Sequence, residues 1–72
     1  MPSKYPVLKP EEIIYALQKA GFCYKSQKGS HAKYCRGGRS VIIPRHEEVR
    51  KGTLKSILSQ AGLSLDEFEK LL

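Results

Sequence analysis

The stretch FCYKSQKGSHAKYCRGGRSVIIP, residues 22–44, decides the fold, because apolar and polar residues alternate along it around two glycine-containing turns. Such alternation is typical of strands with one buried face. Gly37-Gly38 fits a two-residue hairpin turn, which needs positive φ. This turn sets the register of three cross-strand pairs: Arg36 with Arg39, Tyr34 with Val41, and Ala32 with Ile43. Pro44 then ends the third strand.

The first hairpin is expected to turn at Lys28-Gly29-Ser30, with Gly29 at the left-handed position of a three-residue loop. This turn predicts the pairs Gln27 with His31, Lys25 with Lys33, and Cys23 with Cys35. Both hairpins then agree on a core face, made of Phe22, Tyr24, Ala32, Tyr34, Val41 and Ile43. The opposite, open face carries Lys25, Gln27, His31, Lys33 and Ile42. A slip of one residue would reverse these faces, so the prediction depends on the register.

Apolar residues at helical spacing predict three helices around this stretch. Their boundary signals are Pro10 and Gly21 for a helix over residues 10–20, Gly52-Thr53 and Gly62 for the second, and a Ser64–Glu67 capping box for the last. The order α-β-β-β-α-α predicts an α+β fold, in which helices cover one face of a three-stranded antiparallel sheet. This order resembles the double-stranded-RNA-binding fold.

The 72 residues are expected to form one domain, residues 1–72, with a small core. A functional site is therefore expected on the surface rather than in a deep pocket. Residues 25–55 carry nine Lys and Arg against two acids, a net charge of +7, while the rest of the chain carries −1. This basic middle favours a phosphate-bearing partner such as nucleic acid. A solvated basic face would explain the same charge without a ligand.

We expect a cytoplasmic protein. No apolar run approaches the roughly 18 residues of a membrane span, and residues 1–8 lack the apolar region of a signal peptide. Cys23 and Cys35 are then expected to be reduced thiols. With His31 and His46 they could supply four metal ligands, but their spacing resembles no zinc site. We therefore expect neither a metal nor a cofactor.

His31 is the candidate catalytic residue of the open face, where Lys25, Lys28 and Lys33 surround it. RNA carries its own nucleophile, the 2′-hydroxyl, and a histidine can remove that proton or protonate the leaving oxygen. Lysines can bind the phosphate and offset the charge that develops on it. The alternative is an exposed strand histidine without a task, because a single histidine is a weak signal.

Three other features carry weaker signals. The helix start at residues 51–55, KGTLK, combines N-terminal amides with two lysines, and is either a phosphate site or an ordinarily solvated helix end. His46 lies in a charged loop and is expected to be solvated. Ser30 is expected to be a turn residue rather than a nucleophile, because no acid stands near it to complete a triad.

Three pieces of the chain carry a family resemblance: the first helix with Gly21-Phe22, Lys28-Gly29-Ser30-His31 with Tyr34, and Ile43-Pro44 followed by GTLKSILSQAGLS at residues 52–64. Together they resemble the HicA toxin family, also called YcfA-like, of bacterial and archaeal toxin–antitoxin pairs. The resemblance implies a double-stranded-RNA-binding-like fold and an endoribonuclease that cleaves mRNA independently of ribosomes. It also implies a HicB-like antitoxin that blocks the toxin, and contact with DNA only through the antitoxin complex. By motif position it makes His31 the catalytic residue.

The chain departs from the family pattern at two positions. Many relatives have a second histidine directly after the first, where this chain has Ala32. Many also have a histidine directly after the strand-ending proline, whereas here Arg45 precedes His46. His46 is therefore no more than a candidate auxiliary residue.

The sequence thus predicts an mRNA interferase of a type II toxin–antitoxin system, with His31 as general acid or base and without metal. The predicted RNA-binding residues are Lys25, Lys28, Gly29, Ser30, Lys33, Lys51 and Lys55. One alternative is a non-catalytic RNA-binding module of the same fold, or an inactive toxin that retains antitoxin binding. A weaker alternative is a DNA-binding regulator, although the chain shows no helix-turn-helix pattern.

Overall fold

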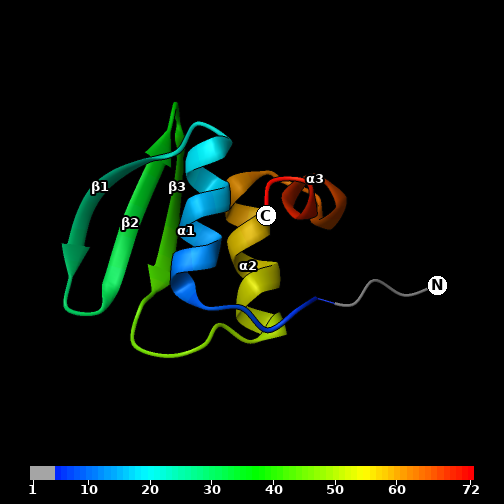
Figure 1. Ribbon diagram of the computed structural model, residues 1–72. Coiled ribbons are helices and arrows are strands. Elements are labelled where there is room, and N and C mark those ends of the chain that lie inside the picture. Colours follow the sequence, from blue (N-terminus) through cyan, green and yellow to red (C-terminus); the bar gives the residue numbers. More distant parts are fainter. Residues whose placement is uncertain (1–4) are drawn as a thin grey trace.

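The computed structural model describes residues 5–72, so the first half of the segment 1–8, expected not to be a signal peptide, lies outside this range (Figure 1). The observed order confirms the predicted α-β-β-β-α-α succession. Its elements are α1 (Pro10–Lys19), β1 (Cys23–Lys28), β2 (His31–Arg36), β3 (Arg39–Pro44), α2 (Lys51–Ala61) and α3 (Leu65–Glu69). No helix within residues 5–72 is long and apolar enough to cross a membrane.

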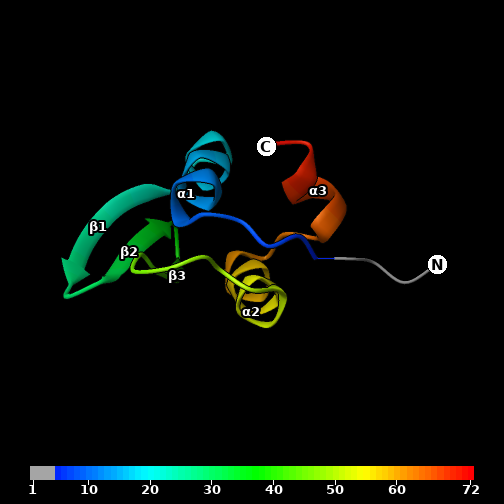
Figure 2. The same cartoon turned by 60° about the horizontal axis from the view of Figure 1, so that its bottom comes forward.

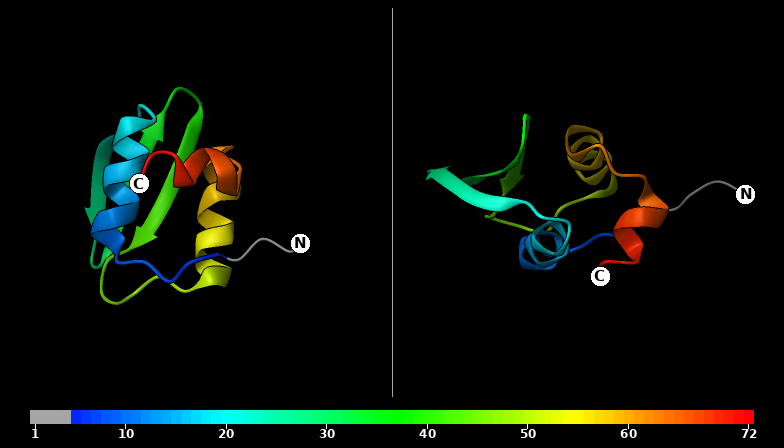
Figure 3. Two further views of the ribbon diagram at one scale, coloured as in Figure 1. Left: turned by 45° about the vertical axis from the view of Figure 1, so that its right-hand side comes forward. Right: turned by 90° about the horizontal axis from the view of Figure 1, so that it is seen from above.

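The three strands form one antiparallel sheet in the order β1-β2-β3. Helix α1 lies over one face of this sheet and α2 runs beside β3, as Figure 2 shows. Helix α3 lies on the side of these two helices that is farther from the sheet (Figure 3). Along β2 and β3 buried residues alternate with accessible ones, so the other face of the sheet is open.

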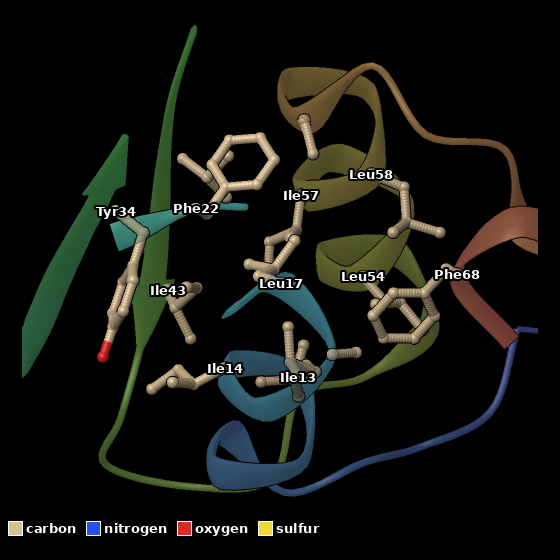
Figure 4. Close-up of a cluster of buried hydrophobic side chains, with 14 of the residues drawn as sticks. Ile13, Ile14, Leu17, Phe22, Tyr34, Ile43, Leu54, Ile57, Leu58 and Phe68 are labelled. Carbon is tan, nitrogen blue, oxygen red and sulfur yellow. The ribbon is translucent and has the colours of Figure 1, made fainter. Parts of the chain in front are cut away.

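One hydrophobic core joins the sheet to all three helices (Figure 4). The largest side chains that are buried almost completely are Ile13, Leu17, Phe22, Val41, Ile43, Val49, Leu54, Ile57 and Phe68. The predicted core face is confirmed for Phe22, Ala32, Tyr34, Val41 and Ile43. Tyr24 is the exception, because its side chain is 56% exposed although it lies opposite Tyr34. It lies on β1, at the edge of the sheet, where its ring and the Tyr34 ring form an edge-to-face contact.

The second hairpin has the predicted register, with Arg36 opposite Arg39, Tyr34 opposite Val41 and Ala32 opposite Ile43. In the first hairpin the predicted three-residue turn is wrong. The turn is Gly29-Ser30 alone, so Lys28 lies opposite His31 and Ser26 opposite Lys33. A bulge between Tyr24 and Ser26 absorbs the difference, and the predicted Cys23–Cys35 pair is therefore still observed.

The physical reason for this difference is the position of the glycine. Gly29 has φ +59° and is the first of the two turn residues, which suits a two-residue hairpin with Gly at its first central position. The shift moves Gln27 off the predicted open face, because it now lies opposite the buried Ala32. Lys25 becomes the extra residue of the bulge rather than the partner of Lys33.

Two arginine side chains connect the sheet to the carboxyl ends of α1 and α2 by hydrogen bonds. Arg36 and Arg39 lie opposite each other beside the Gly37-Gly38 turn, where like charges would be unfavourable. Their side chains diverge: Arg36 Nη1 donates to the Ala20 carbonyl at 2.6 Å, and Arg39 Nη1 donates to the Gln60 carbonyl at 3.3 Å. Each guanidinium thus meets the carboxyl end of a helix, where positive charge is favourable.

Candidate active site

His31 is the first residue of β2 and is exposed on the open face of the sheet. Lys28 lies opposite it on β1, and Pro44 lies opposite it on β3. Lys33 is two positions farther along β2, so its side chain leaves the same face. The predicted placement of His31 and Lys33 on the open face is therefore confirmed. The corrected register adds Lys28 as the direct neighbour of the histidine.

A short network of hydrogen bonds holds the turn that precedes His31. The Arg45 N–H donates to the Ser30 carbonyl at 2.7 Å. The Arg45 guanidinium donates to Gln27 Oε1 at 3.3 Å, and Gln27 Nε2 in turn donates to the Gly29 carbonyl at 3.0 Å. Ser30 thus contributes its backbone to this network, in line with its expected role as a turn residue. These hydrogen bonds connect the loop after β3 to the β1–β2 turn.

His46 lies beside His31, which the sequence reasoning missed. The two ring centroids are 6.1 Å apart and the ring planes meet at 68°. The His46 side chain is 48% exposed, and its Nδ1 is 4.0 Å from Glu47 Oε1. The sequence did contain a signal for this. The predicted pairing of Ala32 with Ile43, extended along the same register, places Pro44 opposite His31 and so brings the following residues close to His31. The expectation of a solvated loop residue therefore overlooked a neighbouring histidine.

The other lysines predicted to bind RNA are not direct strand neighbours of His31. Lys25 is in the bulge of β1, at the free edge of the sheet. Lys51 begins α2 and Lys55 follows one turn later, and both are exposed. The start of α2 is at the same end of the molecule as the β1–β2 turn (Figure 1). Its N-cap, Arg50, makes no side-chain capping bond, so the first amides of α2 have no cap from that side chain.

Within residues 5–72 no group of three or more His, Cys, Asp or Glu side chains is arranged to hold a metal ion. Cys23 and Cys35 are free thiols on neighbouring strands. The Cys23 Sγ lies 3.9 Å from the Gly21 carbonyl, and Cys35 Sγ lies 3.4 Å from Ser40 Oγ. The groups near His31 are therefore one further imidazole and lysines, which can transfer protons and bind phosphate.

Comparisons with known proteins show the family to which the chain belongs. Residues 10–63 match the family model described as the HicA toxin of bacterial toxin–antitoxin systems. The chain is also 36% identical over 58 residues to a protein of Pseudomonas fluorescens (strain Pf0-1) named probable mRNA interferase HicA. That alignment covers 78% of this chain and 97% of the relative. The matched range runs from the start of α1 to just beyond α2 and contains both histidines. This chain belongs to the HicA toxin family.

Proposed function

We propose that this protein is an mRNA-cleaving toxin and that His31 is its catalytic residue. The observation that carries the proposal is the place of His31: exposed on the open face of the sheet, beside Lys28 and near Lys33. The relative's name, probable mRNA interferase HicA, supports RNA as the substrate. The net charge of +6 favours binding of a polyanion.

The proposed reaction uses the RNA's own 2′-hydroxyl as the nucleophile. His31 accepts the proton of this hydroxyl as its oxygen attacks the adjacent phosphorus. The bond from the 2′ oxygen to phosphorus forms and the bond from phosphorus to the 5′ oxygen breaks. The products are a 2′,3′-cyclic phosphate and a 5′-hydroxyl, to which a second proton must be delivered. Lys28 and Lys33 hold the phosphate and offset its developing charge.

This chemistry requires no metal ion. Hard cations such as Mg²⁺ are held by carboxylates and carbonyl oxygens, and the residues beside His31 are mainly cationic or neutral. Glu47 lies beside His46, with its Oε1 atom 4.0 Å from Nδ1, and one exposed carboxylate is a poor site for a divalent ion. We therefore propose metal-independent cleavage.

The RNA-binding surface is proposed to extend beyond the lysines beside His31. Lys25 on the sheet edge and the start of α2, with Lys51 and Lys55, would track the phosphate backbone without reading bases. At the Gly29-Ser30 turn an RNA strand can come close to the protein backbone. The space beside Gly29 is open, because a Cβ added there would meet nothing within 4 Å.

A HicB-like antitoxin is the proposed protein partner. A basic, exposed site can be blocked by an acidic protein surface that competes with RNA phosphates. The domain is small, and a partner that binds only the folded state also stabilises it. The family description, a toxin of a toxin–antitoxin pair, supports this partner.

The test is cleavage of a defined RNA by the wild type, by His31→Ala and by Lys19→Gln, a control on α1, which covers the opposite face of the sheet. We expect His31→Ala to abolish cleavage and growth arrest, and Lys19→Gln to retain both. Because His31 is exposed, the variant should lose no more than about 0.5 kcal/mol of stability. EDTA should leave wild-type cleavage intact, and deoxyribose at the cut site should prevent it.

Two results would contradict the proposal. Full cleavage by folded His31→Ala would remove the residue from the mechanism. Tight RNA binding without any cleavage by the wild type would favour the alternative function, a non-catalytic RNA-binding module.

A further inference from the structure

The loop after β3 is anchored by backbone hydrogen bonds at both of its ends, to the β1–β2 turn at its start and to the segment before α1 at its end. At its start, the hydrogen bond from the Arg45 N–H to the Ser30 carbonyl continues the pairing of β2 with β3 beyond Pro44. At its end, Val49 is buried and exchanges two backbone hydrogen bonds with Leu8, at 2.7 and 3.2 Å. The short charged segment between these anchors, residues 46–48, is exposed.

This anchoring determines where His46 lies. Arg45 is held opposite Ser30, and the chain then bends at His46, which therefore follows directly on a residue next to His31. The edge-to-face contact of its ring with His31 agrees with this placement. Both imidazoles are exposed, and Glu47 Oε1 lies 4.0 Å from the Nδ1 atom of His46.

We infer that His46 is a second catalytic residue, which protonates the leaving 5′ oxygen while His31 accepts the proton of the 2′-hydroxyl. The inference rests on the proposed RNA cleavage and assigns the step that His31 alone leaves open. The entering and leaving oxygens lie on opposite sides of one phosphorus atom. An acid and a base that serve them must therefore be near neighbours that face the same phosphate, as two rings 6.1 Å apart on one open face do.

The protons balance across this step. The 2′-hydroxyl gives its proton to the neutral imidazole of His31, and the imidazolium of His46 gives one to the 5′ oxygen. The enzyme ends the step with His31 protonated and His46 neutral, and solvent restores both forms. The charged groups that the sheet and the loop place around the pair are Lys28, Lys33, Arg45 and Glu47.

The inference is tested with two RNA substrates that differ in one atom. In the second, sulfur replaces the 5′ oxygen at the cut site. A thiol has a pKa of about 8.5, far below that of an alcohol, so its thiolate leaves without being protonated. We expect His46→Gln to slow cleavage of the ordinary RNA by about 10²–10⁴-fold, the usual contribution of a general acid. On the sulfur substrate the same variant should cleave nearly as fast as the wild type.

Three comparisons keep the result unambiguous. His31→Ala should fail on both substrates, because deprotonation of the 2′-hydroxyl is needed in each. Glu48→Gln, a change in the same loop, should leave both rates unaltered. On ordinary RNA the wild-type cleavage rate should first rise and then fall as pH increases. On the sulfur substrate the decrease at alkaline pH should be absent. This last measurement needs no variant and so does not depend on whether His46→Gln folds.

Several results would overturn the assignment. An equal loss by His46→Gln on both substrates would make His46 a structural or positioning residue. An unchanged rate on ordinary RNA would remove it from the reaction. If the wild-type cleavage rate still fell at alkaline pH on the sulfur substrate, a group other than His46 would be responsible for that decrease. If the wild type cleaved neither substrate, the proposed function itself would fail, which is a distinct outcome.

Discussion

Gly62→Ala offers a quantitative check on how the sheet is joined to α2. Gly62 ends α2 with φ +73°, in the left-handed region. A Cβ at this position would lie 2.6 Å from Arg39 Cζ and 2.8 Å from Arg39 Nε. The alanine variant therefore meets two separate penalties: backbone strain, and displacement of the arginine that donates to the Gln60 carbonyl.

The size of the effect follows from these two parts. A left-handed conformation costs an L-residue about 1–2 kcal/mol. The arginine can move aside because it is flexible and exposed, so the second part is the lost hydrogen bond, about 0.5–1.5 kcal/mol. The expected total is about 1.5–3.5 kcal/mol, against a stability of about 4–11 kcal/mol for a domain of this length. The melting temperature should fall by about 4–8 °C for each kcal/mol.

Urea unfolding of a glycine series separates the two parts. Gly37 has φ +57°, and a Cβ added there would meet nothing within 4 Å, so Gly37→Ala should show the strain alone. Gly38 has open space and no positive φ, so Gly38→Ala should be neutral or stabilising by up to about 1 kcal/mol. In an Arg39→Ala background, Gly62→Ala should cost no more than Gly37→Ala does. An equal cost for Gly62→Ala with and without Arg39 would refute the role given to the arginine.

Three further predictions concern RNA, the antitoxin and acid. Lys33→Gln should weaken RNA binding and lower the slope of log affinity against log salt by under one unit, since each single-strand contact contributes about 0.7. Lys19→Gln should leave the slope unaltered. An unchanged slope for both variants would mean that the basic face is only solvated. A HicB-like antitoxin at 100-fold excess over its dissociation constant should add about 2.7 kcal/mol of stability and protect residues 25–34 most strongly from hydrogen exchange; protection confined to α1 or α3 would contradict occlusion of the site. The Glu67 carboxylate accepts the Ser64 N–H at 2.9 Å, which lowers the pKa of Glu67, with the Ser64 hydroxyl as a further cause. A lowered folded-state pKa stabilises the fold above the unfolded-state pKa, and this contribution is lost as pH falls through the folded value. Glu67→Gln should therefore make unfolding less sensitive to acid over that range, and an identical acid transition would show that the cap does not contribute.

The sequence by itself determined the succession of elements and most of the core. Pro10, Gly62 and the Ser64–Glu67 box mark helix boundaries through local backbone chemistry, which acts within one turn of the chain. The Gly37-Gly38 hairpin was equally predictable, because a two-residue turn leaves one register for the strands that it joins. The placement of His31 on the open face followed from that register and is observed.

Only the tertiary structure decided the details that complete the candidate site. A glycine and a serine fit both a two-residue and a three-residue turn, and the bulge at Lys25 allows the shorter turn while Cys23 still pairs with Cys35. The neighbourhood of His46 depends on hydrogen bonds between segments far apart in sequence, from Arg45 to Ser30 and to Gln27. Such contacts leave no periodic pattern in the chain, because they form only when the β3–α2 loop lies against the first hairpin. The local signals therefore specified the scaffold and one histidine, and the packing of the loop brought the second histidine beside it.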